Sequence, residues 1–107
     1  VWHDTSPAVG KAKFPLVGDP THTLTNNFGV HIPEEGLALR GTFVINPEGI
    51  IKTAEVHSNE IARDVKETLR KLKAAVYTAA HPNEVCPAKW NEGDKTIAPS
   101  FDLVGKI

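Results

Sequence analysis

The sequence predicts an α/β fold, and a β-hairpin followed by an amphipathic helix carries that prediction. Residues 41–45 form a β-rich run, a turn follows at 46–49, and residues 50–56 run back as a second strand. Apolar side chains then recur over residues 61–76 at the spacing of one helical face. The 107 residues, 40% of them hydrophobic, are the length of one domain and supply enough apolar material for a core.

The second strand of the hairpin is expected at an edge of its sheet. Its turn has Asn46 first, Pro47 second and Gly49 fourth, which are the preferences of a type I turn. The returning strand carries Ile50, Lys52, Ala54 and Val56 on one face and Ile51, Thr53 and Glu55 on the other. Neither face is uniformly apolar, and this mixture fits an edge strand better than a central one.

The helix is predicted from five apolar positions at steps of four, four, three and four residues: Ile61, Val65, Leu69, Leu72 and Val76. Acidic residues lie early in this segment and basic residues lie late, which suits the helix dipole. Ser58 is the expected N-cap, and Pro82 ends the helix beyond His81.

The segments before the hairpin are less regular. Residues 1–13 are expected to form the frayed end of a helix that runs into a loop. Residues 14–17 form a short apolar run closed by Gly18-Asp19-Pro20, which predicts a strand ending in a turn. Residues 24–28 are expected to form one helical turn, capped by Thr21 or Thr23.

After Pro82 the periodic pattern is lost. Residues 83–107 contain two further prolines and two glycines, but they keep scattered large apolar residues. A disordered tail would have fewer of these, so an irregular arm that lies across a surface and ends in an apolar anchor is expected. We therefore divide the chain into a body, residues 1–80, and a C-terminal arm, residues 81–107.

Composition narrows the possible partners and compartment. The formal net charge is -1, which argues against nucleic acid or an anionic membrane as the main partner. No apolar run approaches the roughly 20 residues of a membrane span, and no signal peptide is visible. A single cysteine excludes an internal disulfide framework and favours the reducing cytosol. The chain opens at Val1 and contains no Met, so we expect a piece of a larger protein.

Cys86 is the first candidate site residue. A lone cysteine is most often a small buried apolar residue. Cys86, however, lies outside regular structure on a proline-bounded arm, with Lys89 nearby. Such an arm can move and expose a sulfur, which thiol exchange needs. A disulfide partner would have to come from outside this chain.

Arg40 and the histidines are the other candidates. Arg40 directly precedes the hairpin and is either a solvated strand-end residue or a fixed cation that stabilises a thiolate or a polar substrate oxygen. Nothing in the local sequence decides between these readings. The five histidines are dispersed: His3, His22, His31, His57 and His81. No pair has metal-ligand spacing and no second cysteine is available, so neither a metal nor another cofactor is expected.

Three segments resemble the peroxiredoxin family. They are Asp19-Pro20-Thr21, the run from Glu35 to Ile45 with its Pro-x-Gly turn, and the run from His81 to Trp90 after a long helix. Within the third, Val-Cys-Pro-Ala-Lys-Trp is highly specific. The likeness covers essentially the whole chain, including residues 100–107, and points to the typical two-cysteine, bacterial alkyl hydroperoxide reductase type.

The resemblance implies a thioredoxin-like fold and the reduction of hydrogen peroxide, organic hydroperoxides and peroxynitrite. In that family a peroxidatic cysteine becomes a sulfenic acid, and a resolving cysteine of the partner subunit converts it to a disulfide. A flavoprotein or thioredoxin-type reductase then restores the thiols. Cys86 matches the resolving cysteine, and Arg40 matches the arginine beside the peroxidatic sulfur.

The resemblance also implies a homodimer that assembles to a decamer. The strand over residues 50–56 matches the edge that pairs with its twin across the dimer axis. The interface residues expected from this match and from the arm are Ile50, Lys52, Ala54, Val56, Trp90 and Ile107. Trp90, Phe101 and Ile107 are expected to be the packing residues of the arm.

The sequence departs from the family in one large respect. The peroxidatic Phe-x-x-Cys-Pro-Thr segment is not present, nor are the early strands of the family domain. We therefore expect the C-terminal portion of the enzyme, with an incomplete sheet, open apolar faces and no peroxidase cycle of its own. The region before Asp19 has no Gly-Gly-Leu-Gly segment and the tail has no Tyr-Phe, which implies resistance to over-oxidation. The alternative is a catalytically inactive module that binds protein through the edge strand and the arm.

Overall fold

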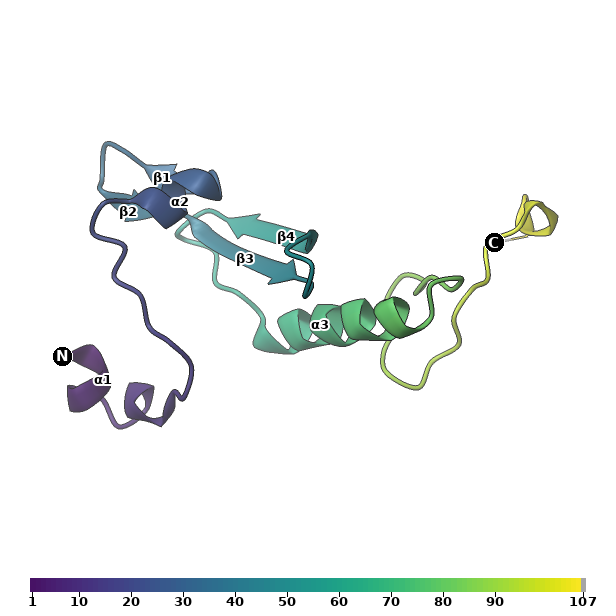
Figure 1. The fold of residues 1–107 in the computed structure, drawn as a ribbon, viewed down its shortest axis with the longest axis horizontal. Helices are drawn as coiled ribbons and strands as arrows, with labels where there is room; N and C mark the ends of the chain where they lie inside the picture. Colours follow the sequence, from purple (N-terminus) through teal and green to yellow (C-terminus); the bar gives the residue numbers. More distant parts are fainter. Residues whose placement is uncertain (107) are drawn as a thin grey trace.

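The structure, a computed structural model, describes residues 1–106. In chain order its elements are α1 (Trp2–Thr5), η1 (Val9–Lys11), α2 (Thr23–Asn27), β1 (His31–Ile32), β2 (Leu37–Ala38), β3 (Arg40–Ile45), β4 (Ile51–His57), α3 (Val65–Ala80) and η2 (Phe101–Leu103). The hairpin β3–β4 and α3 form the middle of an extended molecule of 55 × 32 × 29 Å. The N-terminal turns and the C-terminal segment lead away from it toward opposite ends (Figure 1).

The hairpin forms where the sequence predicts it. β3 and β4 pair antiparallel, from Arg40 opposite His57 to Ile45 opposite Ile51. The turn closes through a hydrogen bond of 2.9 Å from the Gly49 N–H to the Asn46 carbonyl, while the Asn46 side chain accepts from the N–H of Ile50 at 2.9 Å. Gly49 has φ +82°, which favours glycine because it lacks a Cβ. The predicted turn is confirmed.

A register shift between Val44 and Ile45 interrupts the ladder near the turn. Val44 pairs with Thr53 and Ile45 pairs with Ile51, so Lys52 is the extra residue of a β-bulge. Among residues 1–106, β3 and β4 form a sheet of two strands, and the outer edge of each is therefore unpaired there. In a sheet of two strands each strand has an open edge, so the edge position of β4 stays a prediction.

One face of the hairpin packs against the segment that precedes it. The rings of Phe28 and Phe43 lie 4.6 Å apart, and Val30 beside them is only 6% exposed. Gly41 faces this cluster closely: a Cβ there would lie 2.9 Å from the Phe43 ring and 3.1 Å from Val30. This close approach explains a glycine in the middle of an otherwise regular strand.

The N-cap of helix α3 lies six residues later than predicted. Its N-cap is Asp64, whose carboxylate accepts from the N–H groups of Lys66 at 3.0 Å and Glu67 at 3.4 Å. The prediction of Ser58 was wrong because the Ser58 hydroxyl bonds the Glu60 carboxylate, within a turn that Ser58 and Ile61 close. The helix ends at Ala80, before Pro82, as predicted.

The apolar stripe of α3 is exposed in this structure. Its members in the helix are Val65, Leu69, Leu72 and Val76, and their exposed fractions run from 44% to 78%. The helix instead meets the hairpin through its more polar side, where the Lys71 ammonium lies 3.4 Å from the Glu55 carboxylate of β4. The helix is therefore as predicted, while its apolar side is left open, as expected of an incomplete domain.

Two predictions for the N-terminal segments were wrong. Residues 14–17 form no strand, because no described strand lies beside them to pair with, and Phe14 and Val17 are exposed. Helix α2 forms, but Thr21 and Thr23 do not cap it, since their hydroxyls bond each other at 3.0 Å. The Asp19 carboxylate accepts the N–H groups of residues 24 and 25 instead, at 3.1 and 3.0 Å.

The C-terminal segment is irregular, as predicted, but the prediction that Phe101 packs was wrong, since it is 97% exposed. Val85 and Ile97 form an isolated antiparallel bridge with hydrogen bonds of 2.8 and 3.0 Å. Between them the chain folds around Trp90, whose ring is 2% exposed. Ile107, which we expected to anchor the arm at an interface, lies outside the described residues. Within residues 1–106, no helix is long and apolar enough to cross a membrane.

Candidate functional site

Cys86 lies in the arm just beyond α3 and is a free, half-buried thiol. It borders a cavity of about 470 Å³ between the arm, the second half of α3 and β4. The lining residues are Lys52, Thr53, Arg70, Lys71, Ala74, Ala75, Thr78 and residues 84–89. The sulfur is therefore neither sealed in a core nor fully in solvent, which is compatible with a thiol that reacts after a local movement.

Two side chains of α3 bind the arm on either side of Cys86. The Arg70 Nη1 donates to the Trp90 carbonyl at 2.9 Å. The Tyr77 hydroxyl donates to the Glu84 carboxylate at 2.7 Å. We call residues 84–90 the Cys86 loop. Its two ends are thus fixed to one helix, at positions separated by two helical turns.

Trp90 closes the Cys86 loop from inside. Its indole N–H donates to the Asp94 carbonyl at 3.0 Å, and its ring centre lies 5.2 Å from that of Tyr77. The Trp90 N–H donates to the Pro87 carbonyl at 3.1 Å, across a turn in which Lys89 has φ +61°. The tryptophan therefore sets the shape of the loop from within its own chain.

Charged partners surround this loop. Arg70 donates to the Glu67 carboxylate through Nε at 2.8 Å and through Nη2 at 2.6 Å. That hydrogen bond is the main reason why the pKa of Arg70 is raised and the pKa of Glu67 is lowered. The bond to Glu84 is the main cause that raises the pKa of Tyr77. Arg70 and Cys86 line the same cavity.

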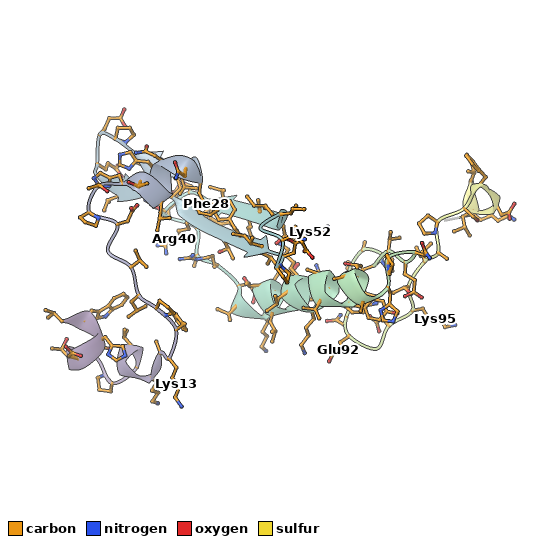
Figure 2. All side chains as sticks on the ribbon, viewed as in Figure 1. Lys13, Phe28, Arg40, Lys52, Glu92 and Lys95 are labelled. Atoms are coloured by element: carbon orange, nitrogen blue, oxygen red, sulfur yellow. The ribbon has the colours of Figure 1, made fainter. Side chains whose placement is uncertain are left out.

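Arg40 lies elsewhere in the chain. It opens β3, and its Nε donates to the Asn59 carbonyl at 2.8 Å, which fixes the half-buried guanidinium at the sheet rim. Arg40 does not line the cavity beside Cys86. Figure 2 shows it at the α2 end of the hairpin, whereas the arm follows the far end of α3. The structure therefore does not bring Arg40 and Cys86 together within one chain.

Two arginines that the structure brings to these places, Arg63 and Arg70, were not among the site residues predicted from the sequence. Arg63 donates to the Gly41 carbonyl at 3.3 Å, next to Arg40 at the same end of the hairpin. Arg70 binds the Cys86 loop. The one available signal for Arg70 was the spacing of Glu67 and Arg70, which lie three residues apart on one helical face.

The predicted interface residues of the hairpin are exposed. Ile50, Lys52, Ala54 and Val56 are all exposed, and Lys52 lines the cavity beside Cys86 on the α3 side of β4. Glu55 also lies on the α3 side of β4, close to Lys71. Its carboxylate lies 2.7 Å from the His57 ring, which lowers the pKa of Glu55 and raises the pKa of His57.

Trp90 and the histidines complete the predicted set. Trp90 is enclosed by its own chain. It can therefore contribute to an interface only indirectly, by shaping the arm around it. Two histidines, His22 and His31, stack with ring centres 4.4 Å apart. No cluster of three or more potential metal-ligating side chains occurs in the described part of the chain.

Comparison with known proteins identifies the class. Residues 2–54 match the AhpC/TSA family and residues 76–106 match the C-terminal domain of 1-Cys peroxiredoxin. A solved 2-Cys peroxiredoxin from Plasmodium vivax, in its reduced form, superposes with a TM-score of 0.84 at 29% identity, over 94% of this chain and 53% of the other. The fold is therefore part of a thioredoxin-like peroxiredoxin fold.

Sequence relatives specify the family further. Alkyl hydroperoxide reductase C from Pseudomonas aeruginosa is 85% identical over 100% of this chain, and the Salmonella typhimurium protein of that name is 57% identical over 99%. Enterococcus faecalis AhpC superposes with a TM-score of 0.75 at 40% identity, over 80% of this chain and 52% of the other. The chain belongs to the AhpC/TSA peroxiredoxin family, as the resemblance predicts. It spans 57% of the length of the two curated relatives.

Proposed function

We propose that this chain is the resolving part of a thiol peroxidase that reduces hydrogen peroxide and organic hydroperoxides. In this reaction a peroxidatic thiolate outside this chain attacks the peroxide, releases an alcohol or water, and becomes a sulfenic acid. The thiolate of Cys86 then attacks that sulfur, forms a disulfide and expels hydroxide, which is protonated to water. A dithiol reductase reduces the disulfide back to two thiols.

The accessible position of Cys86 is the observation that carries this proposal. The thiol is free and half-buried on an irregular arm, beside a cavity rather than inside a core. Its segment is also the part of the sequence with the most specific resemblance to the family. A sulfur in this setting can leave its position through a movement of the arm alone, which leaves the body at residues 1–80 intact.

The separation of Arg40 from Cys86 fits a reaction between subunits. We propose that Arg40 stabilises the peroxidatic thiolate and holds the peroxide, a role that a fixed guanidinium suits. Its hydrogen bond to the Asn59 carbonyl restricts its position before any substrate arrives. Arg40 and Cys86 do not share a cavity in one chain. The two roles are compatible if the arm of one subunit brings its Cys86 to the sheet rim of another subunit, where Arg40 lies.

The edge of β4 is the proposed dimer contact. Ile50, just before it, and Lys52, Ala54 and Val56 within it are exposed, and its outer backbone edge is unpaired within residues 1–106. An edge of this kind can pair with a second strand through backbone hydrogen bonds. We propose a homodimer that assembles to a decamer, acts in the cytoplasm, depends on a flavoprotein or thioredoxin-type reductase, and resists over-oxidation.

The central test is Cys86→Ser in the full-length protein. After one equivalent of hydrogen peroxide, the parent protein is expected to run as a disulfide-linked dimer on a non-reducing gel, and the variant as a monomer. The matched control is Ser100→Ala, which changes a residue of the same arm without adding or removing a thiol. Retention of the linked dimer in Cys86→Ser would disprove the resolving role.

The second candidate is a protein-binding module without catalytic activity, acting through the same edge strand and arm. The exposed apolar residues of α3 and the unpaired edge favour the binding of another protein surface, whether or not Cys86 reacts. Cys86→Ser separates the two functions. Binding would persist in the variant if the module is only a docking surface, while peroxide-dependent crosslinking would be lost if the thiol reacts.

A further inference from the structure

The Cys86 loop is held at both ends by one face of α3. Arg70 donates to the carbonyl of Trp90 at 2.9 Å, and Tyr77 donates to the carboxylate of Glu84 at 2.7 Å. Cys86 lies between these two attachment points. Because the intervening loop has no helix or strand of its own, these contacts, the bridge from Val85 to Ile97 and the packing of Trp90 determine where the sulfur sits.

Arg70 is oriented before it meets the arm. The Glu67 carboxylate takes its Nε at 2.8 Å and its Nη2 at 2.6 Å, and this leaves Nη1 to donate to the arm. A guanidinium is planar, so two bonds to one carboxylate fix the direction of the third donor. Arg70 is also 25% exposed in its side chain, and therefore loses part of its hydration in making these contacts.

We infer that Arg70 is a positioning residue for Cys86: oriented by Glu67, it binds the arm at Trp90 and keeps the sulfur inside the cavity between α3 and the arm. This deepens the proposed function, which assigns the reaction to Cys86 and Arg40 and gives Arg70 no part. Arg70 touches no reacting atom in this role. It determines how often the loop opens, and hence how exposed the thiol is to any reagent.

A second contact between α3 and the arm supplies a matched control. The Lys73 ammonium lies 3.6 Å from the Glu92 carboxylate, with side chains 43% and 70% exposed. Such surface ion pairs contribute little because both charges remain hydrated. Lys73→Met and Arg70→Met thus remove one cation each, from the same helix and facing the same arm. If charge alone held the arm, the two variants would behave alike.

The test is the rate at which N-ethylmaleimide alkylates Cys86 in the reduced full-length protein at one fixed pH, followed by the mass of the Cys86 peptide. Arg70→Met is expected to raise the rate about ten-fold, the effect of losing one charge-assisted hydrogen bond, and Lys73→Met to leave it within about two-fold. Equal rates in Arg70→Met and the parent protein would overturn the inference, as would equal increases in both variants.

Further variants keep the test decisive. Arg70→Lys retains one donor and is expected to restore most of the protection, whereas Glu67→Gln removes the charge that orients Arg70 and should raise the rate about three-fold. If Arg70→Met does not fold, these two variants decide: parental rates in both would refute the role. A Trp2→Phe background leaves Trp90 as the sole tryptophan of residues 1–107, and its emission should shift to longer wavelength when the arm opens.

The alkylation result is independent of peroxidase chemistry. It needs neither peroxide nor a second subunit with a reactive sulfur. A ten-fold increase in Arg70→Met together with an unchanged crosslink in Cys86→Ser would keep Arg70 as the residue that positions the loop and reject the resolving role. The reverse pair of results would keep the resolving role and reject Arg70.

Discussion

The two sides of α3 differ in their contacts with the rest of the chain. One side carries Arg70 and Tyr77, which bind the arm through hydrogen bonds, and Glu67, which binds Arg70. The other side carries the apolar stripe, whose residues remain exposed. The polar side finds its partners within about two dozen residues of chain, so those contacts form locally. The apolar side needs a surface that residues 1–106 do not supply, and it shows what kind of partner the domain lacks.

The largest effect is expected at Trp90, on the side that already has its partners. Trp90→Ala removes a side chain that is 2% exposed, and should cost about 3–5 kcal/mol of stability in the arm, because a large cavity is left. Limited trypsin digestion should then cleave rapidly after Lys89 and Lys95. Trp2→Ala is the control, since Trp2 is 71% exposed, and its digestion pattern should match that of the parent protein.

The exposed stripe gives the converse experiment. Leu72→Ala should cost about 2–3 kcal/mol in the full-length protein if the rest of the domain covers the stripe. In the 107-residue chain, where Leu72 is 44% exposed, the same change should cost far less. Urea unfolding of both forms measures the difference. Equal costs in the two forms would mean that the stripe stays open in the full-length protein and that the two sides of α3 do not differ in the proposed way.

The start of α3 tests a smaller contribution. Asp64→Ala removes the side chain that accepts two N–H groups of the first turn, and should cost about 1 kcal/mol. Ser58→Ala should change stability by less than about 0.5 kcal/mol, since Ser58 only bonds Glu60 in a surface turn. Thermal unfolding of the two variants ranks them. A larger loss at Ser58 would restore the cap predicted from the sequence.

The smallest of these effects is expected from acid, which should weaken the contacts between the polar side of α3 and the arm. The pKa of Glu67 is lowered from its ordinary value of 4.5, chiefly by the hydrogen bond from Arg70. A lowered pKa in the folded protein means that the stabilisation is complete above pH 4.5 and is lost as the pH falls through the lowered value. Trp90 emission should report the opening of the arm in this acid range. Glu67→Gln should remove that part of the pH dependence, and an unchanged profile would exclude Glu67 as its source.

The parts of the fold that depend on neighbours in sequence could be predicted. The turn at Asn46 and Gly49 was recognised because each residue has a direct conformational reason to be there. The end of α3 was recognised from Pro82, and the irregular arm from its prolines and lost periodicity. The family segment around Cys86 also identified the residue whose free thiol the structure places on the arm beside a cavity.

Other features could not be predicted because they depend on competition between similar side chains or on distant contacts. Ser58 and Asp64 are both good N-caps, and only the turn at residues 58–61 decides between them. Residues 14–17 have a strand-like composition, but a strand also needs a neighbour. Arg70 binds a backbone carbonyl 20 residues away. Since every residue has a backbone carbonyl, the sequence does not indicate which one is bound.

The bulge at Lys52 limits how a second strand could add to this molecule. Regular geometry along β4 is available from Thr53 to His57, whereas the irregular step beside Ile51 turns the backbone away from a straight course. An incoming strand therefore finds room for only a short ladder before the hydrogen-bonding groups fall out of alignment. Such an interruption favours a defined, finite assembly over the unlimited stacking by which open edges form fibres.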